Sequence, residues 1–489
     1  MALAAYPNPD AFDVNTDFAD LLKVVGLDPK DTGGDIEFKG KDPILPSKHR
    51  LGAIISLGMM GAAAATQILY RMRGGPAQDL FVDLRTAVAH INPLVAFRPK
   101  IGDHGYQLLF ADPKFNPLGF GLYPTKDNRW YLPTAAYPMA IPPWTDLLNC
   151  QLSTQSVTNA IAQWNAQELE DTAAARGMIG AFCRTPDEWL AHAQGKLMSE
   201  TPLIEIIKIG DSPPELPPLL NFDRPLSGLK VAAFTHVIAG QVTARTLAEQ
   251  GAEVLHLARP EYEYDSLWVD TSVGFRSAWM DLNDRSSVAK VEKTLAGADV
   301  MIESFRGRKI ASRGLSAERV AEIRPGIIYT SIRAFGWTGP WAQRGGFDMD
   351  ANCCSGFTVD EGTRDAPKLP PTIVLNDYLA GYLTAMGVLA ALILRAKHGG
   401  SYHVRTSLTR FSMWYGALGL LDPNYVSEMM KHPDHAVVAP RGIELDTAFG
   451  RVSRLEPGIS FSKTPGRWEV PGAEVIVPRG ASPLAWLGS

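Results

Sequence analysis

The chain of 489 residues is poor in the features that define several functional classes. Its four cysteines are too few for a disulfide framework at this length, and neither they nor the ten histidines show the spacing of a zinc site. We therefore expect no bound metal. The net charge is only −5 and no basic tract is present, which argues against a nucleic-acid partner.

The chain also lacks the marks of a secreted or membrane protein. Its first residues show no charged region followed by an apolar run, which predicts no signal peptide and a cytoplasmic location. Two apolar runs, Leu51–Tyr70 and Ile373–Leu394, approach the length of a membrane span. The first is rich in glycine and alanine and is flanked by arginines, and the second contains Asp377, which is costly in lipid. We expect both to be helices buried in a protein core, and no membrane partner.

A proline-rich stretch, Ser212–Gly228, is the best candidate for a linker and divides the chain into two parts. The second part opens with short apolar segments that alternate with amphipathic ones. Strands are predicted at Leu229–Phe234, Glu253–Leu257, Asp299–Ser304 and Gly326–Ile332, and helices at Gly240–Gln250, Ser287–Ala296 and Ala317–Ile323. This alternation is typical of an α/β fold with a doubly wound, Rossmann-like parallel sheet.

The turn after the first predicted strand limits which nucleotide such a sheet would bind. A dinucleotide site needs three spaced glycines there and an acid at the end of the second strand. This chain has FTHVIAGQVTA, with one glycine, and its second strand runs into Arg259. NAD is therefore disfavoured, whereas an arginine can pair with the phosphates of another nucleotide. A surface arginine in a loop explains Arg259 equally well.

An internal repeat links the two parts of the chain. Met60–Ala87 and Met386–Ser412 share an M-G start, a helix rich in alanine and leucine, a basic end, a Gly-Gly turn, a β-prone run and the start of a helix. Glycine is favoured just after a helix end. The alignment predicts a duplication that places Leu51 opposite Asp377; chance is the alternative, because one residue must be inserted to hold the register.

Several longer segments resemble family III (CaiB–BaiF type) CoA-transferases. The likeness begins with LSGLKVAAFTHVIAGQVTARTLAEQGAEVLHLARP, continues through AWMDLNDRSSVAKVEKTLAGADVMIESFRGRKIASRGLS and IRPGIIYTSIRAFGWTGPWAQRGGFDMDANCCSG, and runs through PTIVLNDYLAGYLTAMGVLAAL to HVRTSLTRFSMW. It spans Leu226 to about Gly419. The resemblance implies the architecture of that family, a large doubly wound domain with a smaller α+β domain. It also implies that coenzyme A or acyl-CoA is a substrate and that no cofactor is tightly bound.

In that family the Asp before the glycine- and alanine-rich helix is the nucleophile, which places this role on Asp377. Its carboxylate would attack an acyl-CoA thioester to give a mixed anhydride. The CoA thiolate would then form an aspartyl-CoA thioester, which an incoming carboxylic acid converts into a new acyl-CoA. Asp377 also suits a helix N-cap, where the helix dipole keeps a carboxylate ionised. The alternatives are an acyl-CoA racemase, isomerase or lyase that uses the same Asp, and a degenerate CoA-binding protein without activity.

The resemblance also carries binding positions onto this chain. The implied CoA-binding residues are His236, Val237, Ile238, Ala239, Arg259, Leu282, Ser304, Phe305, Arg306 and Arg313. Ser312 stands where a CoA-contacting arginine is common, and Arg313 follows it. Phe347 and Asp348 fall at the substrate pocket. Because Phe347 replaces the histidine of the related α-methylacyl-CoA racemases and cannot titrate, the racemase alternative is disfavoured.

The expected domain organisation follows from the resemblance and the repeat. Residues 1–215 are predicted to form a truncated CoA-transferase-like half that includes the small domain, 216–228 the linker, 229–425 the CoA-binding catalytic large domain, and 426–489 a tail that packs back on it. Segments Gly119–Pro138 and Thr185–Asp211 resemble parts of the small domain. Family members form interlocked dimers, so we expect either a monomeric pseudo-dimer or a homodimer. Packing of residues 1–215 as a separate body away from Asp377 would contradict this hypothesis.

Overall fold

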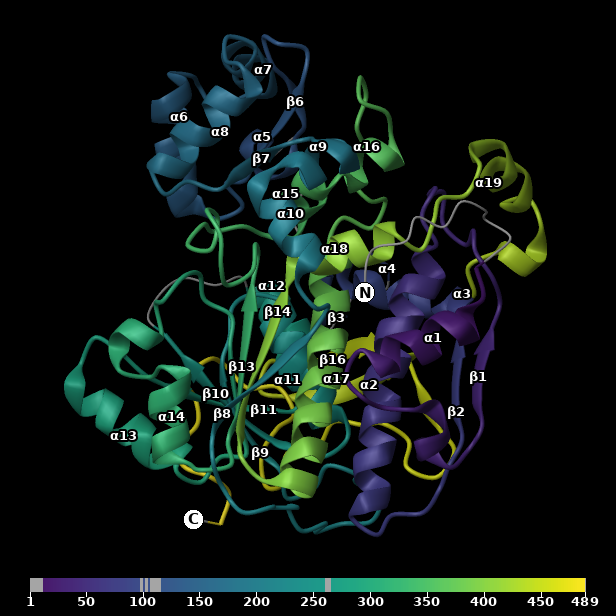
Figure 1. Ribbon diagram of the computed structural model, residues 1–489, viewed down its shortest axis with the longest axis vertical. Helices are drawn as coiled ribbons and strands as arrows, with labels where there is room; N and C mark the ends of the chain where they lie inside the picture. The colour runs from purple at the N-terminus through teal and green to yellow at the C-terminus, as the bar shows by residue number, and fades with distance from the viewer. Residues whose placement is uncertain (1–11, 97–99, 102–103, 106–115, 260–264, 489) are drawn as a thin grey trace.

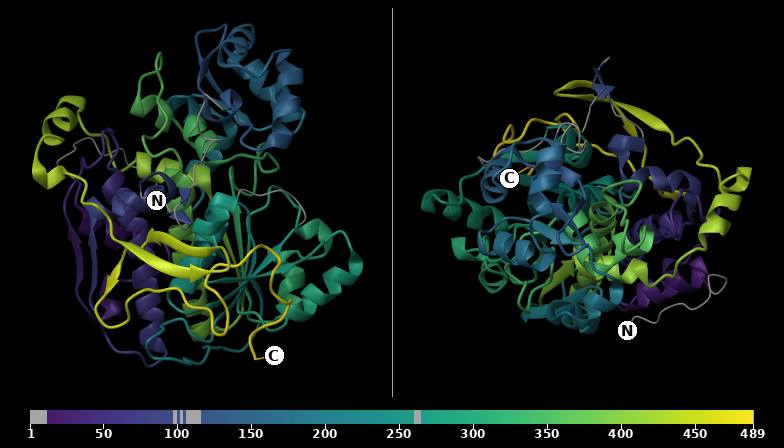
Figure 2. Two further views of the ribbon diagram at one scale, coloured as in Figure 1. Left: turned by 180° about the vertical axis from the view of Figure 1, so that it is seen from behind. Right: turned by 90° about the horizontal axis from the view of Figure 1, so that it is seen from above.

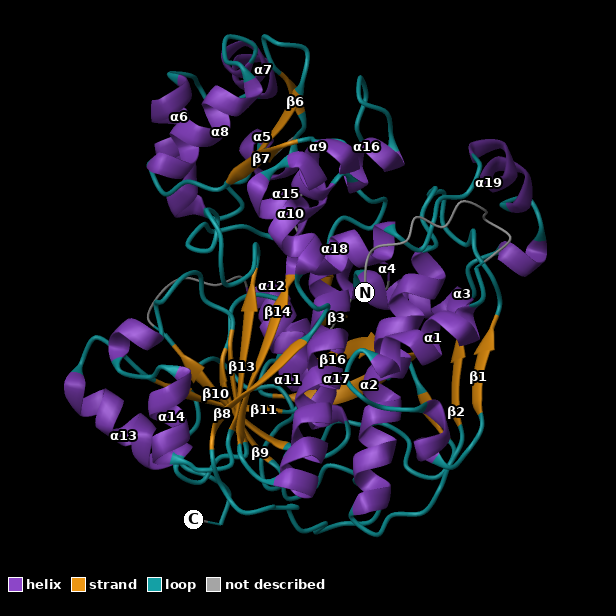
Figure 3. Ribbon diagram, in the orientation of Figure 1, coloured by secondary structure: helices purple, strands orange, loops and turns teal. Residues whose placement is uncertain are grey.

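A seven-stranded sheet forms the centre of the protein in a computed structural model (Figures 1 and 3) that describes residues 12–96, 100–101, 104–105, 116–259 and 265–488. The strand order is β11 (Phe275–Trp279), β10 (Glu253–Ala258), β9 (Lys230–Phe234), β12 (Val300–Glu303), β13 (Ile328–Arg333), β14 (Ser401–Ser407) and β8 (Glu205–Gly210). The first six are parallel, and β8 runs antiparallel to β14. The predicted doubly wound parallel sheet is therefore confirmed.

Helices cover both faces of this sheet because alternate residues of each strand point to opposite sides. Val231 and Ala233 of β9 face a core shared with α11 (Ala239–Glu249) and α17 (Leu375–His398). Ala232 and Phe234 face a second core shared with α13 (Arg285–Leu295) and α14 (Ala317–Ile323). With both faces buried, β9, β10, β12 and β13 read as continuous apolar runs, which is why the sequence located these four strands within two residues of their observed bounds; it did not predict β11.

The order of the strands places a crevice at the carboxyl end of the sheet. The chain starts at β9, adds β10 and β11 on one side, and then returns to add β12, β13 and β14 on the other. Between β9 and β12 the connections therefore leave in opposite directions. In open α/β sheets such a switch point is where ligands bind, outside the carboxyl ends of the strands.

Two long apolar helices, α2 (Leu51–Met72) and α17, lie side by side in the interior (Figure 1). Their glycines allow this close approach: a Cβ on Gly58 would lie 2.7 Å from Leu379 Cδ1, and one on Gly61 would lie 2.8 Å from Met386 Sδ. By length and composition both helices would be able to cross a membrane, but nearly all of their apolar residues are buried inside the protein.

A separate lobe from the first half of the chain stands above the carboxyl end of the sheet (Figure 1). It contains α5 (Pro117–Phe120), β5 (Tyr123–Pro124), β6 (Trp130–Pro133), α6 (Ile141–Leu148), α7 (Thr154–Ile161), α8 (Ala166–Ala175) and β7 (Gly180–Phe182). Tyr131, Trp144 and Leu169 form the centre of its own apolar core. The chain then descends through α9 (Pro186–Ala191) and α10 (Ala193–Glu200) into strand β8 of the large sheet.

The repeated segments adopt the same order of elements. Helix α2 is followed by Gly74–Gly75, β2 (Leu80–Asp83) and α3 (Leu84–Ala87), as α17 is followed by Gly399–Gly400, β14 and α18 (Leu408–Gly416). Each of these strands has one parallel and one antiparallel neighbour. For β2 they are β1 (Ile36–Lys39) and β17 (Ser460–Phe461), and for β14 they are β13 and β8.

Each half of the chain thus supplies an antiparallel strand to the other half. Strand β8 comes from the first half and completes the large sheet, whereas β17 comes from the C-terminal tail and completes the small sheet of β1 and β2. The tail, which includes α19 (Pro423–Met429), β15 (Gly442–Thr447) and β16 (Gly450–Leu455), crosses the back of the molecule in yellow (Figure 2, left). Residues 12–215 are therefore not a separate body.

The proline-rich stretch between the halves is held in place by one buried side chain. The Arg73 guanidinium, at the end of α2, donates hydrogen bonds to the carbonyl oxygens of Pro217 (3.0 Å), Pro218 (2.5 Å), Pro225 (2.6 Å) and Ser227. Burial lowers the pKa of Arg73 to about 10. The stretch is consequently anchored to the core and does not behave as a flexible tether.

Candidate active site

Two connected cavities meet at Asp377, where the lobe of the first half faces the carboxyl end of the large sheet. The outer cavity leaves about 450 Å³ open to the centres of water-sized molecules, and the inner one about 50 Å³. Both are lined by Ala136, Tyr137, Val237, Ile238, Phe347 and Asp377. Ala136 and Tyr137 belong to the first half, so the described residues of that half contribute directly to the pocket around Asp377.

Asp377 is the third residue of α17, whose N-cap is Val374, so the interpretation of Asp377 as the N-cap is wrong. The capping role belongs to Asp348, whose Oδ2 accepts a hydrogen bond from the Asp377 backbone N–H at 2.7 Å. This contact satisfies one of the unpaired N–H groups of the first helical turn. Within the described part of the chain the Asp377 carboxylate itself has no hydrogen-bond partner. It is therefore open to react with a molecule in the cavity.

Three carboxyl groups lie close together at this helix start. Burial, and secondarily the charge of Asp350, raise the pKa of Asp377 to about 7. Burial, and secondarily the charge of Asp377, raise the pKa of Asp348 well above its usual range. Burial also raises the pKa of Asp350 to about 7. The expectation that the helix dipole keeps Asp377 fully ionised is therefore wrong, because desolvation outweighs the dipole.

The loop after β9 and the end of β12 meet at the switch point and form one wall of the outer cavity. The His236 backbone N–H donates to Ser304 Oγ at 2.9 Å, and the Ser304 hydroxyl donates to the His236 carbonyl oxygen at 2.8 Å. A Cβ on Gly240 would lie 2.8 Å from Ser304 Oγ, so only glycine allows α11 to start this close to β12. The sequence from His236 to Ala239 therefore lines the cavity at the start of a helix.

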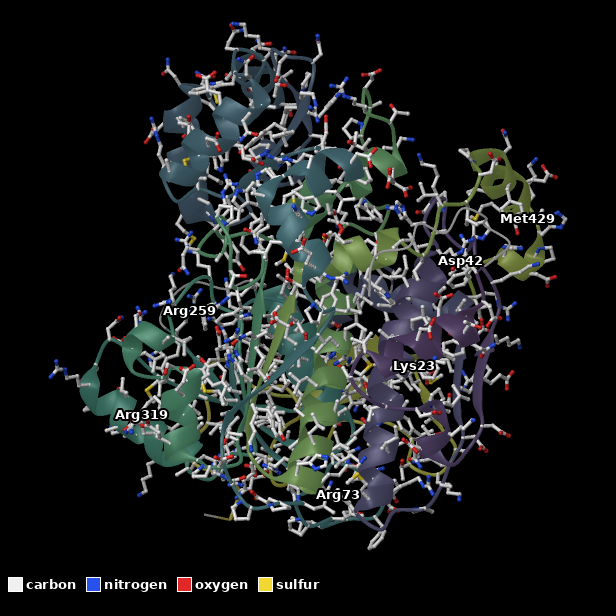
Figure 4. The ribbon with its side chains drawn as sticks, viewed as in Figure 1. Lys23, Asp42, Arg73, Arg259, Arg319 and Met429 are labelled. Carbon is white, nitrogen blue, oxygen red and sulfur yellow. The ribbon has the colours of Figure 1, made fainter. Side chains whose placement is uncertain are left out.

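Cationic side chains surround the outer cavity. Arg176, Arg259, Arg306 and Lys309 all line it. The Arg259 guanidinium lies 4.8 Å above the Phe305 ring, and Arg306 Nη1 donates to the Gly177 carbonyl oxygen at 3.1 Å. Figure 4 shows Arg259 between the upper lobe and the sheet. This arrangement suits a ligand that carries several phosphate charges.

Another lining cation, Arg333, is neutralised by a buried ion pair. Its Nη2 lies 2.9 Å from Glu303 Oε1, and Glu303 Oε2 also accepts the Phe305 backbone N–H at 3.0 Å. This pair holds the end of β12 against β13 and fixes the position of Phe305. Arg333 therefore supports the wall of the outer cavity, and its charge is already compensated.

The inner cavity is mainly apolar and extends from Asp377 toward the first half. Besides the residues that it shares with the outer cavity, it is lined by Asn92, Phe120, Leu267, Asp348, Met349, Ile373, Val374 and Tyr378. No lysine, arginine or histidine is among its described lining residues. Across the described ranges no group of three His, Cys, Asp or Glu side chains is placed to hold a metal ion.

Most of the residues that the sequence singled out come together around these cavities. His236, Val237, Ile238, Ala239, Arg259, Ser304, Phe305 and Arg306 line the outer cavity, Asp348 the inner one and Phe347 both. Leu282 and Arg313 line neither. Leu282 packs against the core beneath α13, and Arg313 is half-buried and donates to the Lys309 carbonyl oxygen and to Asn283 Oδ1.

Sequence reasoning missed the cavity residues that come from the first half, notably Asn92, Phe120 and Tyr137. Phe120 and Tyr137 lie within Gly119–Pro138, the segment that resembles a small-domain hairpin, which was the available signal. Nothing in the sequence around Asn92 marked it. Lys309 and Leu267 were missed as well, although both lie inside the segments that carry the family resemblance or between them.

Comparison with known proteins finds relatives for part of the chain. Residues 226–443 match the model of CoA-transferase family III. An acetyl-coenzyme A transferase of Hypoxylon pulicicidum is 27% identical over 65% of this chain and 57% of its own length. The human succinyl-CoA:glutarate CoA-transferase is 29% identical over 42% of this chain and 50% of its own length. A solved CaiB/BaiF family protein from Brucella suis has 26% identity and a TM-score of 0.37 over 46% of this chain and 65% of that one.

This chain spans about half the length of the curated relatives that it matches. The matched residues include the whole switch point, three of the four cations named above (Arg259, Arg306 and Lys309) and Asp377. Residues 226–443 of this chain therefore belong to CoA-transferase family III.

Proposed function

We propose that the protein is a CoA-transferase that moves coenzyme A from an acyl-CoA to a carboxylic acid, with Asp377 as the nucleophile. The observation that carries this proposal is the position of Asp377 at the junction of two unlike cavities. The cationic outer cavity suits the phosphates and pantetheine arm of CoA, and the apolar inner cavity suits an acyl group. A thioester carbonyl that joins the two would lie beside the Asp377 carboxylate.

The reaction would then proceed by exchange of acyl groups on Asp377. The carboxylate attacks the thioester carbonyl, the C–S bond breaks, and a mixed anhydride and the CoA thiolate are formed. The thiolate attacks the aspartyl carbonyl, which releases the first carboxylate and leaves an aspartyl-CoA thioester. The incoming carboxylate repeats the two steps in reverse order and leaves as the new acyl-CoA.

The surroundings of Asp377 suit each of these steps. The carboxylate is not engaged by another described side chain, so it can attack without first breaking a hydrogen bond. The backbone of Gly345 and Gly346 lines the outer cavity, where glycine N–H groups can approach a developing oxyanion closely. Tyr137 and Ala136 cover the site from the lobe and limit the access of water, which would hydrolyse the anhydride.

The first half of the chain is, in this proposal, a truncated second copy that carries no nucleophile. Its lobe supplies one wall of the site at Asp377, and its strand β8 completes the sheet that carries the site. One chain would then contain a complete active site. No tightly bound cofactor is needed, because every covalent intermediate forms on Asp377 or on CoA.

Hydroxylamine trapping tests the proposal. Incubation with acyl-CoA and hydroxylamine should convert Asp377 into a hydroxamate, detected as a mass change on the peptide that contains it. Asp377→Asn should give no adduct and no transfer while CoA still binds. An isomerase or racemase would instead exchange the α-proton of the acyl group with deuterium and give no hydroxamate. A protein that binds CoA but gives neither result across a broad acyl-CoA panel would contradict an enzymatic role.

A further inference from the structure

The side chains that line the inner cavity determine which acyl groups fit it. We infer that it accepts the uncharged, largely hydrocarbon acyl group of a monocarboxylic acid, with Asn92 as the acceptor for a hydrogen-bond donor on that group. This inference rests on the proposed CoA-transferase function, because it assumes that an acyl group enters from Asp377. The inner cavity leaves about 50 Å³ open to the centres of water-sized molecules, enough for several waters, so an acyl group in it would contact its walls closely.

The walls of the inner cavity are hydrocarbon and aromatic. Phe120 and Tyr137 come from the first half, whereas Leu267, Met349 and Phe347 come from the second. The Tyr137 and Phe347 rings lie 6.2 Å apart between centroids at an interplanar angle of 31°. All but Phe347 are buried, so an acyl chain that replaces water along them gains the hydrophobic free energy of its own buried surface.

The inner cavity offers a second carboxylate no cationic partner among its described lining residues. Asp348 is fully buried and lines the cavity beside Asp377, and Asp350 lies close enough to raise the pKa of Asp377. No described lining residue carries a positive charge that would pair with an anionic acyl end. A dicarboxylic acyl group would therefore bury its second charge without a cationic partner among the described lining residues, which costs far more than it gains.

Asn92 contributes an amide group to this wall. It is buried, and its Nδ2 donates to the Thr372 carbonyl oxygen at 2.9 Å. This hydrogen bond sets the orientation of the amide and leaves Oδ1 as its other polar atom. Among the described residues Oδ1 has no hydrogen-bond partner. A buried acceptor without a partner is costly, so a ligand that donates an O–H or N–H group to it is favoured over one that presents an oxygen lone pair. A hydroxyl group on the acyl chain fits this position.

Transfer to matched acids tests the inference with the full chain. With butanoyl-CoA as donor, hexanoate and 3-phenylpropanoate should be accepted with kcat/KM at least about 100-fold above adipate, which has the same number of carbons as hexanoate. Among the 4-, 5- and 6-hydroxyhexanoates, at least one should be preferred to hexanoate. Asn92→Leu should lower kcat/KM for that preferred acid by about tenfold and should change kcat/KM for hexanoate by less than about threefold.

A second variant keeps the test independent of Asn92. Val374→Lys places a cation in the wall at a half-buried position and should raise the ratio of adipate to hexanoate at least about tenfold. Adipate used as well as hexanoate by the wild type would overturn the inference and leave the proposed transfer intact. Equal losses of hydroxylated and plain acids in Asn92→Leu would overturn the role of Asn92. No transfer with any acid, and no hydroxamate on Asp377, would overturn the proposed function itself.

Discussion

Replacement of Asp377 by asparagine should abolish transfer and at the same time stabilise the fold, with a stabilisation that depends on pH. The pKa of Asp377 is about 7 in the folded protein, whereas an Asp in an unfolded chain titrates near about 3.9. The folded state therefore holds this proton more tightly than the unfolded state. As pH rises from about 4 to about 7, the unfolded chain loses the proton first, and the free energy of unfolding falls.

The size of the effect follows from the two pKa values. A difference of about three pKa units corresponds to about 4 kcal/mol at 1.36 kcal/mol per unit, which is an upper bound. Asp377 is partly open to the cavity, and Asp348 and Asp350 readjust when its charge is removed. We therefore expect Asp377→Asn to raise the free energy of unfolding by about 1–3 kcal/mol at pH 8, by roughly half as much at pH 5.5, and by almost nothing near pH 4.

Urea unfolding followed by tryptophan fluorescence between pH 4 and pH 8.5 measures this dependence. Asp20→Asn is a matched control, because Asp20 is at the surface and pairs with the exposed Lys23; its effect should stay within about 0.5 kcal/mol at every pH. A gain in Asp377→Asn that does not change with pH, or a loss of stability at pH 8, would refute the reasoning that burial rather than a partner sets this pKa.

Four further outcomes follow from the same structure. Transfer by the wild type should rise with pH through about 7 as Asp377 ionises, which a pH–kcat profile checks. Arg259→Gln should weaken CoA binding by about 10–100-fold in calorimetry and leave pantetheine, which has no phosphates, unaffected. Arg73→Met should lower the free energy of unfolding by about 2–4 kcal/mol, because it leaves four carbonyl oxygens of the proline-rich stretch without a donor. Gly381→Ala should lower the free energy of unfolding by about 1–3 kcal/mol, since the new Cβ would lie 2.5 Å from Val242 Cβ. A second substitution, Val242→Ala, should restore part of that loss.

The elements of the large sheet could be predicted because their signals are local. Helix α14 was predicted with its observed bounds, and the helix predicted at Gly240–Gln250 is α11, displaced by a single residue. Apolar periodicity within ten residues is enough to identify such segments. The same argument located Asp377 at the start of a buried helix, since a charge in an apolar run is visible in the sequence alone.

The chemical state of the site and one of its walls could not be predicted in this way. The pKa of Asp377 depends on burial and on Asp350, which becomes its neighbour only in the fold. Tyr137 reaches the cavity from a position 240 residues before Asp377 in the chain, and no pattern in a single sequence records a contact over that separation. The capping of α17 by Asp348 is non-local in the same sense, since the two residues belong to different helices.

The exchange of β8 and β17 has a consequence for the order in which the chain can fold during synthesis. Strand β8 is made about 190 residues before β14, the strand with which it pairs. At roughly 5–20 residues per second, the ribosome needs about 10–40 s to deliver that partner. The edge strand of the first half therefore emerges unpaired, and the apolar surface of α2 stays uncovered until α17 arrives. Truncation at the proline-rich stretch should yield two insoluble pieces, and the nascent first half should need a chaperone to hold it until the second is complete.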